Sequence, residues 1–242
     1  MAPPDEPTSR EELEALLDDP ARASVAREAA ARVESGTTVG LGSGRAVWAT
    51  MELLSRRDEL AGTRVVTASS TTERLAQDMG FTVVGLDGEV RLDLLIDGAD
   101  EVAPDLGLIK GHGAALLREK LVAVATQRFV VVAEASKLVA HLGEQRTLPV
   151  EVVRFAWADT RRRLRDEFAE VELRTADHGA PLVTDEGHHM LHVRLPEGGT
   201  DVRALATRLS YTVGVVEHGL FLDMADEVLL GSDSGAVDVL RR

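Results

Sequence analysis

Short apolar runs alternate with segments of helical periodicity over the first 134 residues of the chain. The apolar runs, which are typical of buried strands, cover residues 37–42, 63–69, 81–86, 92–96 and 128–134. Apolar residues recur at helical spacing in residues 21–33, 45–57, 71–80 and 113–127. Strands that alternate with helices predict a parallel sheet covered by helices on both of its faces.

The pattern changes after the apolar run at residues 147–153. Helices are predicted over residues 159–170 and 201–209, with hairpin-like strands between them at residues 171–176, 182–187 and 189–195. This order predicts a small α+β domain with an antiparallel sheet of ferredoxin-like type. Two further strands are expected at residues 215–221 and 227–231, and the second can rejoin the first sheet.

We therefore expect two domains in an α/β fold. Residues 1–146 and 220–242 form a Rossmann-like domain with a parallel sheet, which begins with a flexible arm over residues 1–20. Residues 147–219 form the small α+β domain. A chain of 242 residues that is 44% hydrophobic has ample apolar material for such cores.

The composition argues against several classes of function. A formal net charge of -14 disfavours non-specific binding to nucleic acid or to an anionic membrane. The chain has no cysteine, which excludes disulfides, thiolate chemistry and cysteine-based metal sites. No apolar run approaches the roughly 20 residues of a membrane span. The N-terminus lacks the basic start and apolar centre of a signal peptide, so we expect a cytoplasmic protein.

Lysine is rare in this chain. Of 27 basic residues only Lys110, Lys120 and Lys137 are lysines, and all the others are arginines. A lysine that is kept in such a chain indicates a need for a compact ammonium group that can exchange a proton, which a guanidinium cannot do. Chance combined with surface solubility is the alternative explanation.

Polar and glycine-rich segments follow four of the predicted strands. They are GLGSG at residues 40–44, ASSTT at 68–72, DGAD at 97–100 and AEASK at 133–137. Parallel α/β sheets bind their ligands at the carboxyl ends of the strands. We therefore expect these glycines, hydroxyls, carboxylates and Lys137 to meet at one edge of the sheet.

The GLGSG segment is compatible with a phosphate site, because glycines let the backbone approach a phosphate and the next helix offers its N–H groups. It lacks the GK[ST] ending of a nucleoside triphosphate loop. A dinucleotide site needs an acidic residue after the second strand, which ends instead in the hydroxyl residues of 69–72. A small phosphate or a sugar fits better, and a tight turn without a ligand is the alternative.

Asp97, Asp100, Lys110 and Glu119 are expected to gather where the strand at 92–96 meets the helix at 113–127. Such a group can transfer protons on a carbon acid. One carboxylate takes the proton, the others move hydroxyl protons, and the ammonium stabilises the developing oxyanion. A structural cluster of ion pairs at the start of a helix is the alternative.

Several motifs match one family in the same order. DGADEV, IKGHGAALLREK and VVVAEASK resemble the signature of the ribose-5-phosphate isomerase type A family, which runs DGADE, KGGGAA, REK and A[DE]xSK. GLGSG, ASSTTERLAQDMG, LPVEV, VTDEGH and VVEHGLF are similar to its other landmarks. The resemblance extends along nearly the whole chain.

The resemblance implies an enzyme that interconverts ribose 5-phosphate and ribulose 5-phosphate in the pentose phosphate pathway, without a metal or organic cofactor. Glu119 would be the base that moves a proton between C2 and C1 through an enediolate. Asp97 and Asp100 would contact sugar hydroxyls and assist ring opening. Lys110 and the turn from Gly111 to Gly113 would hold the reacting end and its oxyanion. A homo-oligomer, either a dimer or a tetramer, is also implied.

The resemblance further implies a set of substrate-binding residues, in which Lys137 and the segment at 43–46 hold the phosphate. The set comprises Ser43, Gly44, Arg45, Ala46, Asp97, Gly98, Ala99, Asp100, Lys110, Gly111, His112, Gly113 and Lys137. The role expected for Lys120 is structural.

Some positions depart from the family pattern. Arg45 and Ala46 stand where the family has hydroxyl residues, so Arg45 either binds phosphate as a bidentate ligand or points to solvent and leaves phosphate binding weaker. His112 replaces a glycine and is interpreted as a tolerated bystander rather than as a proton carrier. Arg22 replaces an early lysine. A non-catalytic or substrate-shifted sugar-phosphate binding protein is therefore the alternative function.

His188, His189 and His192 raise the question of a metal site. On a strand, His188 and His192 share one face while His189 points to the other, so three ligands do not converge. We therefore expect no metal there, and an exposed strand of the small domain is the simpler explanation.

Overall fold

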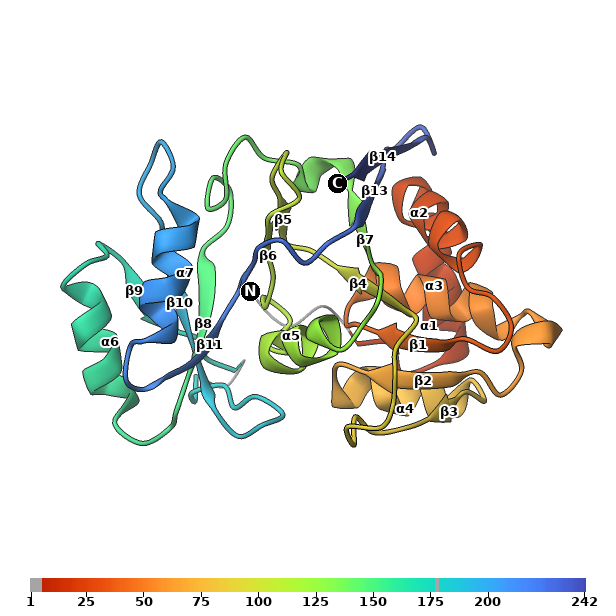
Figure 1. Ribbon diagram of the computed structural model, residues 1–242, viewed down its shortest axis with the longest axis horizontal. Coiled ribbons are helices and arrows are strands. Elements are labelled where there is room, and N and C mark those ends of the chain that lie inside the picture. The colour runs from red at the N-terminus through yellow and green to blue at the C-terminus, as the bar shows by residue number, and fades with distance from the viewer. Residues whose placement is uncertain (1–5, 177–178) are drawn as a thin grey trace.

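The computed structural model describes residues 6–176 and 179–242. Its main sheet has seven strands in the order β14-β13-β7-β4-β1-β2-β3 (Figure 1). Neighbouring strands pair in parallel, except for β13 and β14, which are antiparallel. The strands are β1 (Thr38–Leu41), β2 (Arg64–Thr67), β3 (Thr82–Val83), β4 (Leu94–Gly98), β7 (Phe129–Glu134), β13 (Glu227–Gly231) and β14 (Val237–Arg241).

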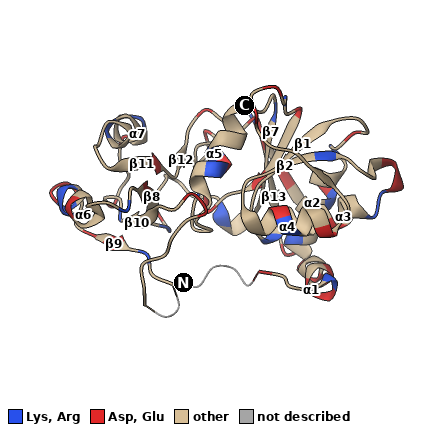
Figure 2. Cartoon of the chain, turned by 90° about the horizontal axis from the view of Figure 1, so that it is seen from below, with Lys and Arg blue, Asp and Glu red and all other residues tan. Residues whose placement is uncertain are grey.

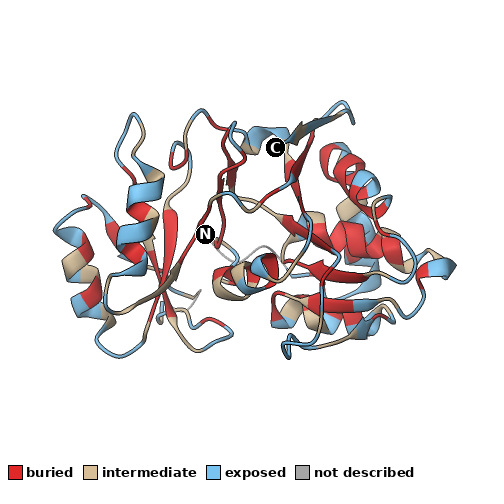
Figure 3. Ribbon diagram, viewed as in Figure 1, coloured by how far each residue is buried: buried red, intermediate tan, exposed pale blue. Residues whose placement is uncertain are grey.

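Successive side chains of these strands enter two different cores, because neighbouring residues of a strand point to opposite faces. Ile96 packs in the core under the first four α-helices, and Leu95 packs in the core on the α5 side. Figure 3 shows the strands buried and the outer helix surfaces exposed, and these surfaces carry acidic and basic residues side by side (Figure 2). The helices are α1 (Arg10–Ala15), α2 (Pro20–Ala30), α3 (Arg45–Ser55), α4 (Ser70–Asp78) and α5 (Leu116–Val124).

A second sheet of four antiparallel strands has the order β11-β8-β10-β9. Its order along the chain is the split βαβ arrangement of ferredoxin-like folds, so the predicted fold class is confirmed. The elements are β8 (Leu148–Val152), α6 (Trp157–Arg165), β9 (Val171–Leu173), β10 (His189–Val193), α7 (Val202–Ser210) and β11 (Val215–His218).

Residues 182–187, which were predicted as a strand of this sheet, form a loop instead. The Gly187 N–H donates to the Thr184 carbonyl, and Gly187 has a φ of 81°, so the polar TDEG segment closes a turn.

A third, three-stranded sheet joins the two cores. It contains β5 (Glu101–Val102), β6 (Leu108–Ile109) and β12 (Leu220–Phe221), in the order β12-β6-β5. Leu108 packs in a main-sheet core, whereas its neighbour Ile109 packs in the core of the small sheet. The single strand predicted at 215–221 is therefore two strands in different sheets, divided at Gly219.

The N-terminal segment differs from the predicted flexible arm. α1 is followed by the 3-10 turn η1 (Leu16–Asp18). Ser9 and Glu12 form a capping box, and Leu13 is buried in the main core, which explains why this segment is helical. The arm prediction is wrong over residues 10–18, and residues 1–5 lie outside the described part of the chain. No helix of the described residues is long and apolar enough to cross a membrane.

Candidate active site

A cleft of about 470 Å³ opens at the carboxyl ends of β1, β4 and β7. Asp97 is fully buried beside it. Every other predicted site residue lines it, so the structure brings the whole predicted set together. The lining includes Ser43, Gly44, Arg45, Ala46, Gly98, Ala99, Asp100, Lys110, Gly111, His112, Gly113, Glu119 and Lys137.

Asp97 is fixed by the backbone around it. Its Oδ1 accepts hydrogen bonds from the N–H of Gly98 at 2.7 Å and from the N–H of Ser43 at 3.2 Å. A Cβ on Gly42 would lie 1.9 Å from the Asp97 carboxyl group. Only glycine at this position lets the turn after β1 approach the carboxylate so closely.

Lys110 joins three groups at the floor of the cleft. Its Nζ donates to the Gly98 carbonyl at 2.6 Å and lies 3.0 Å from Asp97 Oδ2 and 3.2 Å from Glu119 Oε1. The second Glu119 oxygen, Oε2, is buried without a hydrogen-bond partner among the described residues. The site therefore holds a carboxylate oxygen that is free to take a proton.

Burial and charge set the protonation of these groups. Burial raises the pKa of Glu119 to about 8; Lys110 opposes this rise, and the charges of Asp97 and Asp100 add to it. Burial also raises the pKa of Asp97, again against the effect of Lys110. Burial alone would lower the pKa of Lys110, but the charges of Asp97 and Glu119 raise it above its ordinary value. Lys110 is therefore a permanent cation beside a carboxylate whose pKa suits a general base.

In the glycine turn before α5, the strained backbone angles fall on residues other than His112. The positive φ values fall on Gly111, at 110°, and on Ala114, at 65°. A Cβ on Gly111 would lie 2.8 Å from Leu116, so glycine is required there. α5 begins at Leu116 rather than at the predicted Gly113, because the turn continues through Ala114.

His112 anchors this turn. Its N–H donates to Asp100 Oδ2 at 3.0 Å, and its Nε2 lies 2.9 Å from the Thr147 carbonyl. Its ring meets the ring of His192 edge to face, with the centroids 4.9 Å apart. Because Nε2 donates to a backbone carbonyl, this nitrogen is not available to carry a proton to a substrate.

The other end of the cleft is cationic. Gly44, with a φ of 109°, precedes α3, and no side chain caps the first N–H groups of that helix. Arg45 is exposed, Lys137 is partly buried, and neither makes an ion pair with a described residue. Arg22 also lines the cleft but is bound to Asp19 and Glu134. The uncapped helix start and these cations suit a phosphate group.

The family model for ribose 5-phosphate isomerase A (phosphoriboisomerase A) matches residues 64–235. The chain belongs to this family. A ribose-5-phosphate isomerase A from Caulobacter sp. (strain K31) is 46% identical over 224 residues, which span 89% of this chain and 96% of that protein.

Solved structures of ribose 5-phosphate isomerases share the fold. The enzyme from Methanocaldococcus jannaschii has a TM-score of 0.85 at 32% identity, with 97% of this chain and 100% of that chain covered. A D-ribose-5-phosphate isomerase in complex with phospho-erythronic acid has a TM-score of 0.85 at 31% identity, with the same coverage.

Glu101 is the last residue of the DGADE motif. No role was predicted for it in the ribose 5-phosphate isomerase A site. Its buried carboxylate accepts hydrogen bonds from the N–H groups of Gly143, Gln145 and Arg146, each at 2.6 Å. Glu101 thereby holds the loop that brings Arg146 to the cleft. The sequence signal that could have found it is its position as the last residue of the DGADE motif.

Lys120 follows Glu119 on α5 but does not line the cleft of the ribose 5-phosphate isomerase A site. Its Nζ donates to Glu217 Oε1 at 2.8 Å and to the His218 carbonyl at 2.7 Å. It thus ties α5 to β11 of the small sheet, which agrees with the structural role expected for it.

The histidines of β10 and its preceding turn have separate partners. His188 Nδ1 lies 2.9 Å from Glu151 Oε1, and His189 Nδ1 lies 2.8 Å from the Leu182 carbonyl. Within the described ranges, no group of three or more His, Cys, Asp or Glu side chains could hold a metal ion.

Proposed function

We propose that the protein is a ribose-5-phosphate isomerase that interconverts ribose 5-phosphate and ribulose 5-phosphate through an enediolate. Glu119 carries the proposal, because Lys110 holds one of its oxygens at 3.2 Å and leaves the other without a hydrogen bond to a described residue. The names of the relatives support an isomerase over a sugar-phosphate binding protein without catalysis.

The proposed reaction starts from the open-chain aldose. Glu119 Oε2 removes the proton from C2, the C–H electron pair forms the C1–C2 double bond, and O1 becomes an oxyanion that the Lys110 ammonium stabilises. Glu119 then returns the proton to C1 while a carbonyl forms at C2. The hydroxyl proton of O2 moves to O1, and Asp100, which lines the cleft, would carry it.

The ends of the cleft fit the ends of such a substrate. The start of α3, Arg45 and Lys137 would bind the phosphate, and the turn at 111–113 would face the reacting carbons. The solved structure of a D-ribose-5-phosphate isomerase in complex with phospho-erythronic acid supports a sugar-phosphate ligand, since the carboxylate of that acid resembles the charge of an enediolate.

Replacement of Glu119 by glutamine tests the proposal. We expect Glu119→Gln to abolish the exchange of the substrate's C2 proton with deuterated water, which NMR measures. Ribose 5-phosphate should still raise the melting temperature of the variant. Glu151→Gln is a matched control, because Glu151 is equally buried but lies in the small sheet outside the cleft. Isomerisation by Glu119→Gln at the parent rate would show that the base is another group.

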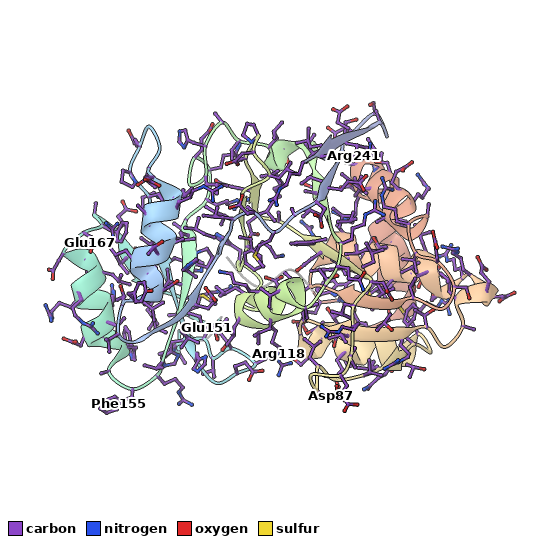
Figure 4. The ribbon with its side chains drawn as sticks, viewed as in Figure 1. Asp87, Arg118, Glu151, Phe155, Glu167 and Arg241 are labelled. Carbon is purple, nitrogen blue, oxygen red and sulfur yellow. The ribbon has the colours of Figure 1, made fainter. Side chains whose placement is uncertain are left out.

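We further propose a cytoplasmic homo-oligomer that needs no metal or organic cofactor. Three large apolar side chains support self-association: Phe155 is 88% exposed, Tyr211 84% and Val213 79%. They lie on two loops of the small sheet that are joined by a hydrogen bond from Val153 N–H to the Gly214 carbonyl. Phe155 is labelled at the edge of the molecule in Figure 4. Light scattering after gel filtration would measure the state.

A further inference from the structure

Arg174 is a buried guanidinium without a carboxylate partner among the described residues. It directly follows β9, and its side chain and backbone together are only 8% exposed. Its backbone is held on both sides, because its N–H donates to the Met190 carbonyl and its carbonyl accepts from Leu182 N–H. Burial lowers the pKa of Arg174, against the effect of the Asp100 charge.

The guanidinium of Arg174 contacts the turn of the active site from behind. Its Nη1 donates to the carbonyl of His112, and Arg174 itself does not line the cleft. The two residues are 62 positions apart in the chain. Through Arg174, the small sheet therefore contributes one positive charge next to the KGHG turn.

This hydrogen bond fixes the direction of a peptide N–H group. The carbonyl of His112 and the N–H of Gly113 belong to the same peptide, which is trans, so the two groups point in opposite directions. The Gly113 N–H thus points away from Arg174, and it makes no hydrogen bond to a described residue. Gly113 is exposed and lines the cleft.

The peptide on the other side of His112 faces the same site. The His112 N–H donates to Asp100 Oδ2 at 3.0 Å. Asp100 thus holds the peptide before His112, and Arg174 holds the peptide after it. The Arg174 cation also polarises the Gly113 N–H, because charge at a carbonyl draws electron density from the amide nitrogen.

We infer that Arg174 is a positioning residue of the isomerisation, which holds and polarises the Gly113 N–H so that it donates to the oxyanion of the enediolate. The inference rests on the proposed isomerase function. A buried cation that makes no salt bridge to a described residue is costly to keep for stability alone, which points to a role in the site.

Three variants test the inference. Arg174→Met removes the charge at similar length, Arg174→Lys keeps it, and Arg161→Met is the control. Arg161 also donates to a backbone carbonyl of the small domain, that of Val171 at 2.9 Å, but it lies away from the cleft. Each variant is assayed for ribose 5-phosphate conversion and for thermal unfolding.

We expect Arg174→Met to lower kcat about 10- to 100-fold with KM nearly unchanged, somewhat less than the loss of a whole oxyanion donor. Arg174→Lys should retain an intermediate kcat, and Arg161→Met should keep the parent kcat.

Two results would overturn the inference. One is an unchanged kcat in Arg174→Met. The other is a loss of kcat that follows the melting temperature, recurs in Arg161→Met and is not relieved in Arg174→Lys. Absence of conversion by the parent protein would instead refute the proposed isomerase function and is seen in the same assay.

Discussion

At the scale of single residues, the site depends on how closely the backbone approaches Asp97. Gly42 has no space for a side chain, since a Cβ would lie 1.9 Å from the Asp97 carboxyl group. The Asp97 carboxylate in turn holds Lys110 at 3.0 Å, and Lys110 holds Glu119. The position of the proposed base therefore depends on a glycine that has no functional group.

Gly42→Ala should disrupt the site without touching a charged residue. The added methyl displaces the Asp97 carboxylate, and a shift of about 1 Å in a catalytic group costs roughly 100-fold in rate. Steady-state kinetics measures the loss. Gly85→Ala is the matched control, because a Cβ there meets no atom within 4 Å. Equal activity of the two variants would contradict the importance of this close approach.

The pKa of Glu119 predicts a pH dependence of activity. A base whose pKa is about 8 is mostly protonated at lower pH, so kcat/KM should rise with pH and level off only above that value. A pH profile of kcat/KM measures this. A plateau of kcat/KM that is already reached near pH 5.5, about one unit above the pKa of an ordinary glutamate, would contradict this prediction.

The same pKa sets the sign of a stability effect. Because the folded state holds a proton on Glu119 that the unfolded state releases between pH 4.5 and about 8, the contribution of Glu119 to the free energy of unfolding is complete below pH 4.5. It is lost as the pH rises toward 8. In denaturant unfolding, the free energy of unfolding of Glu119→Gln should therefore rise relative to that of the parent protein as the pH rises.

The sequence predicts a site residue more readily when the residues that it contacts lie close to it in the chain. Asp97, Lys110 and Glu119 were predicted, because the ends of parallel strands converge on the start of the following helix. Arg174 was not, since its partner His112 is 62 positions away and no local pattern links them. Glu101 was missed for the same reason, as Arg146 lies 45 positions away.

At the scale of elements, α5 is held between the two larger sheets by residues on either side of Glu119. Arg118, labelled in Figure 4, lies 3.4 Å from Asp185 and 2.5 Å from Glu186 in the loop before β10. Lys120 binds Glu217 and His218 on β11. The helix that carries the proposed base is thus fixed by the small sheet.

Lys120→Met should lower the free energy of unfolding by about 1–3 kcal/mol, because it leaves the half-buried Glu217 without its cation. Urea unfolding measures the change. In the double variant Lys120→Met with Glu217→Gln much of the loss should be recovered, since no unpaired charge remains. Equal losses in the single and double variants would show that the ion pair contributes little.

The length of an element decides whether its pattern is legible in the sequence. α4 was predicted from its apolar spacing and ends next to Gly80, as expected. The two-residue strands β5 and β6 were missed, because alternation cannot be recognised over two positions. β12 was predicted only as the end of one longer strand with β11. The start of α5 was placed too early, because Ala114 adopts a left-handed angle that its side chain does not signal.

At the scale of the whole molecule, the cores do not follow the proposed division at residues 146 and 147. Ala103, Ile109 and Leu142 belong to the segment assigned to the large domain, yet they pack in the core of the small sheet. The sequence predicted both sheets, but it did not indicate the third sheet that joins them. We therefore propose that the two domains unfold as one cooperative unit.

Removal of metal ions should leave the activity unchanged. In the proposed reaction the Lys110 ammonium, which lies 3.2 Å from Glu119 Oε1, stabilises the developing oxyanion without a metal. Conversion of ribose 5-phosphate after dialysis against a chelator measures this. Loss of activity that returns with a divalent cation would contradict the metal-free mechanism.

The chain order of the strands has a consequence for biosynthesis. The Lys110 N–H donates to the carbonyl of Gly219, and β13, formed by residues 227–231, lies between β7 and β14. A ribosome releases the chain from its N-terminus at roughly 5–20 residues per second. Until residue 231 has emerged, β7 presents an unpaired edge of the kind that attracts other chains. Nascent chains that stall before this point therefore expose an aggregation-prone strand and hold no finished site.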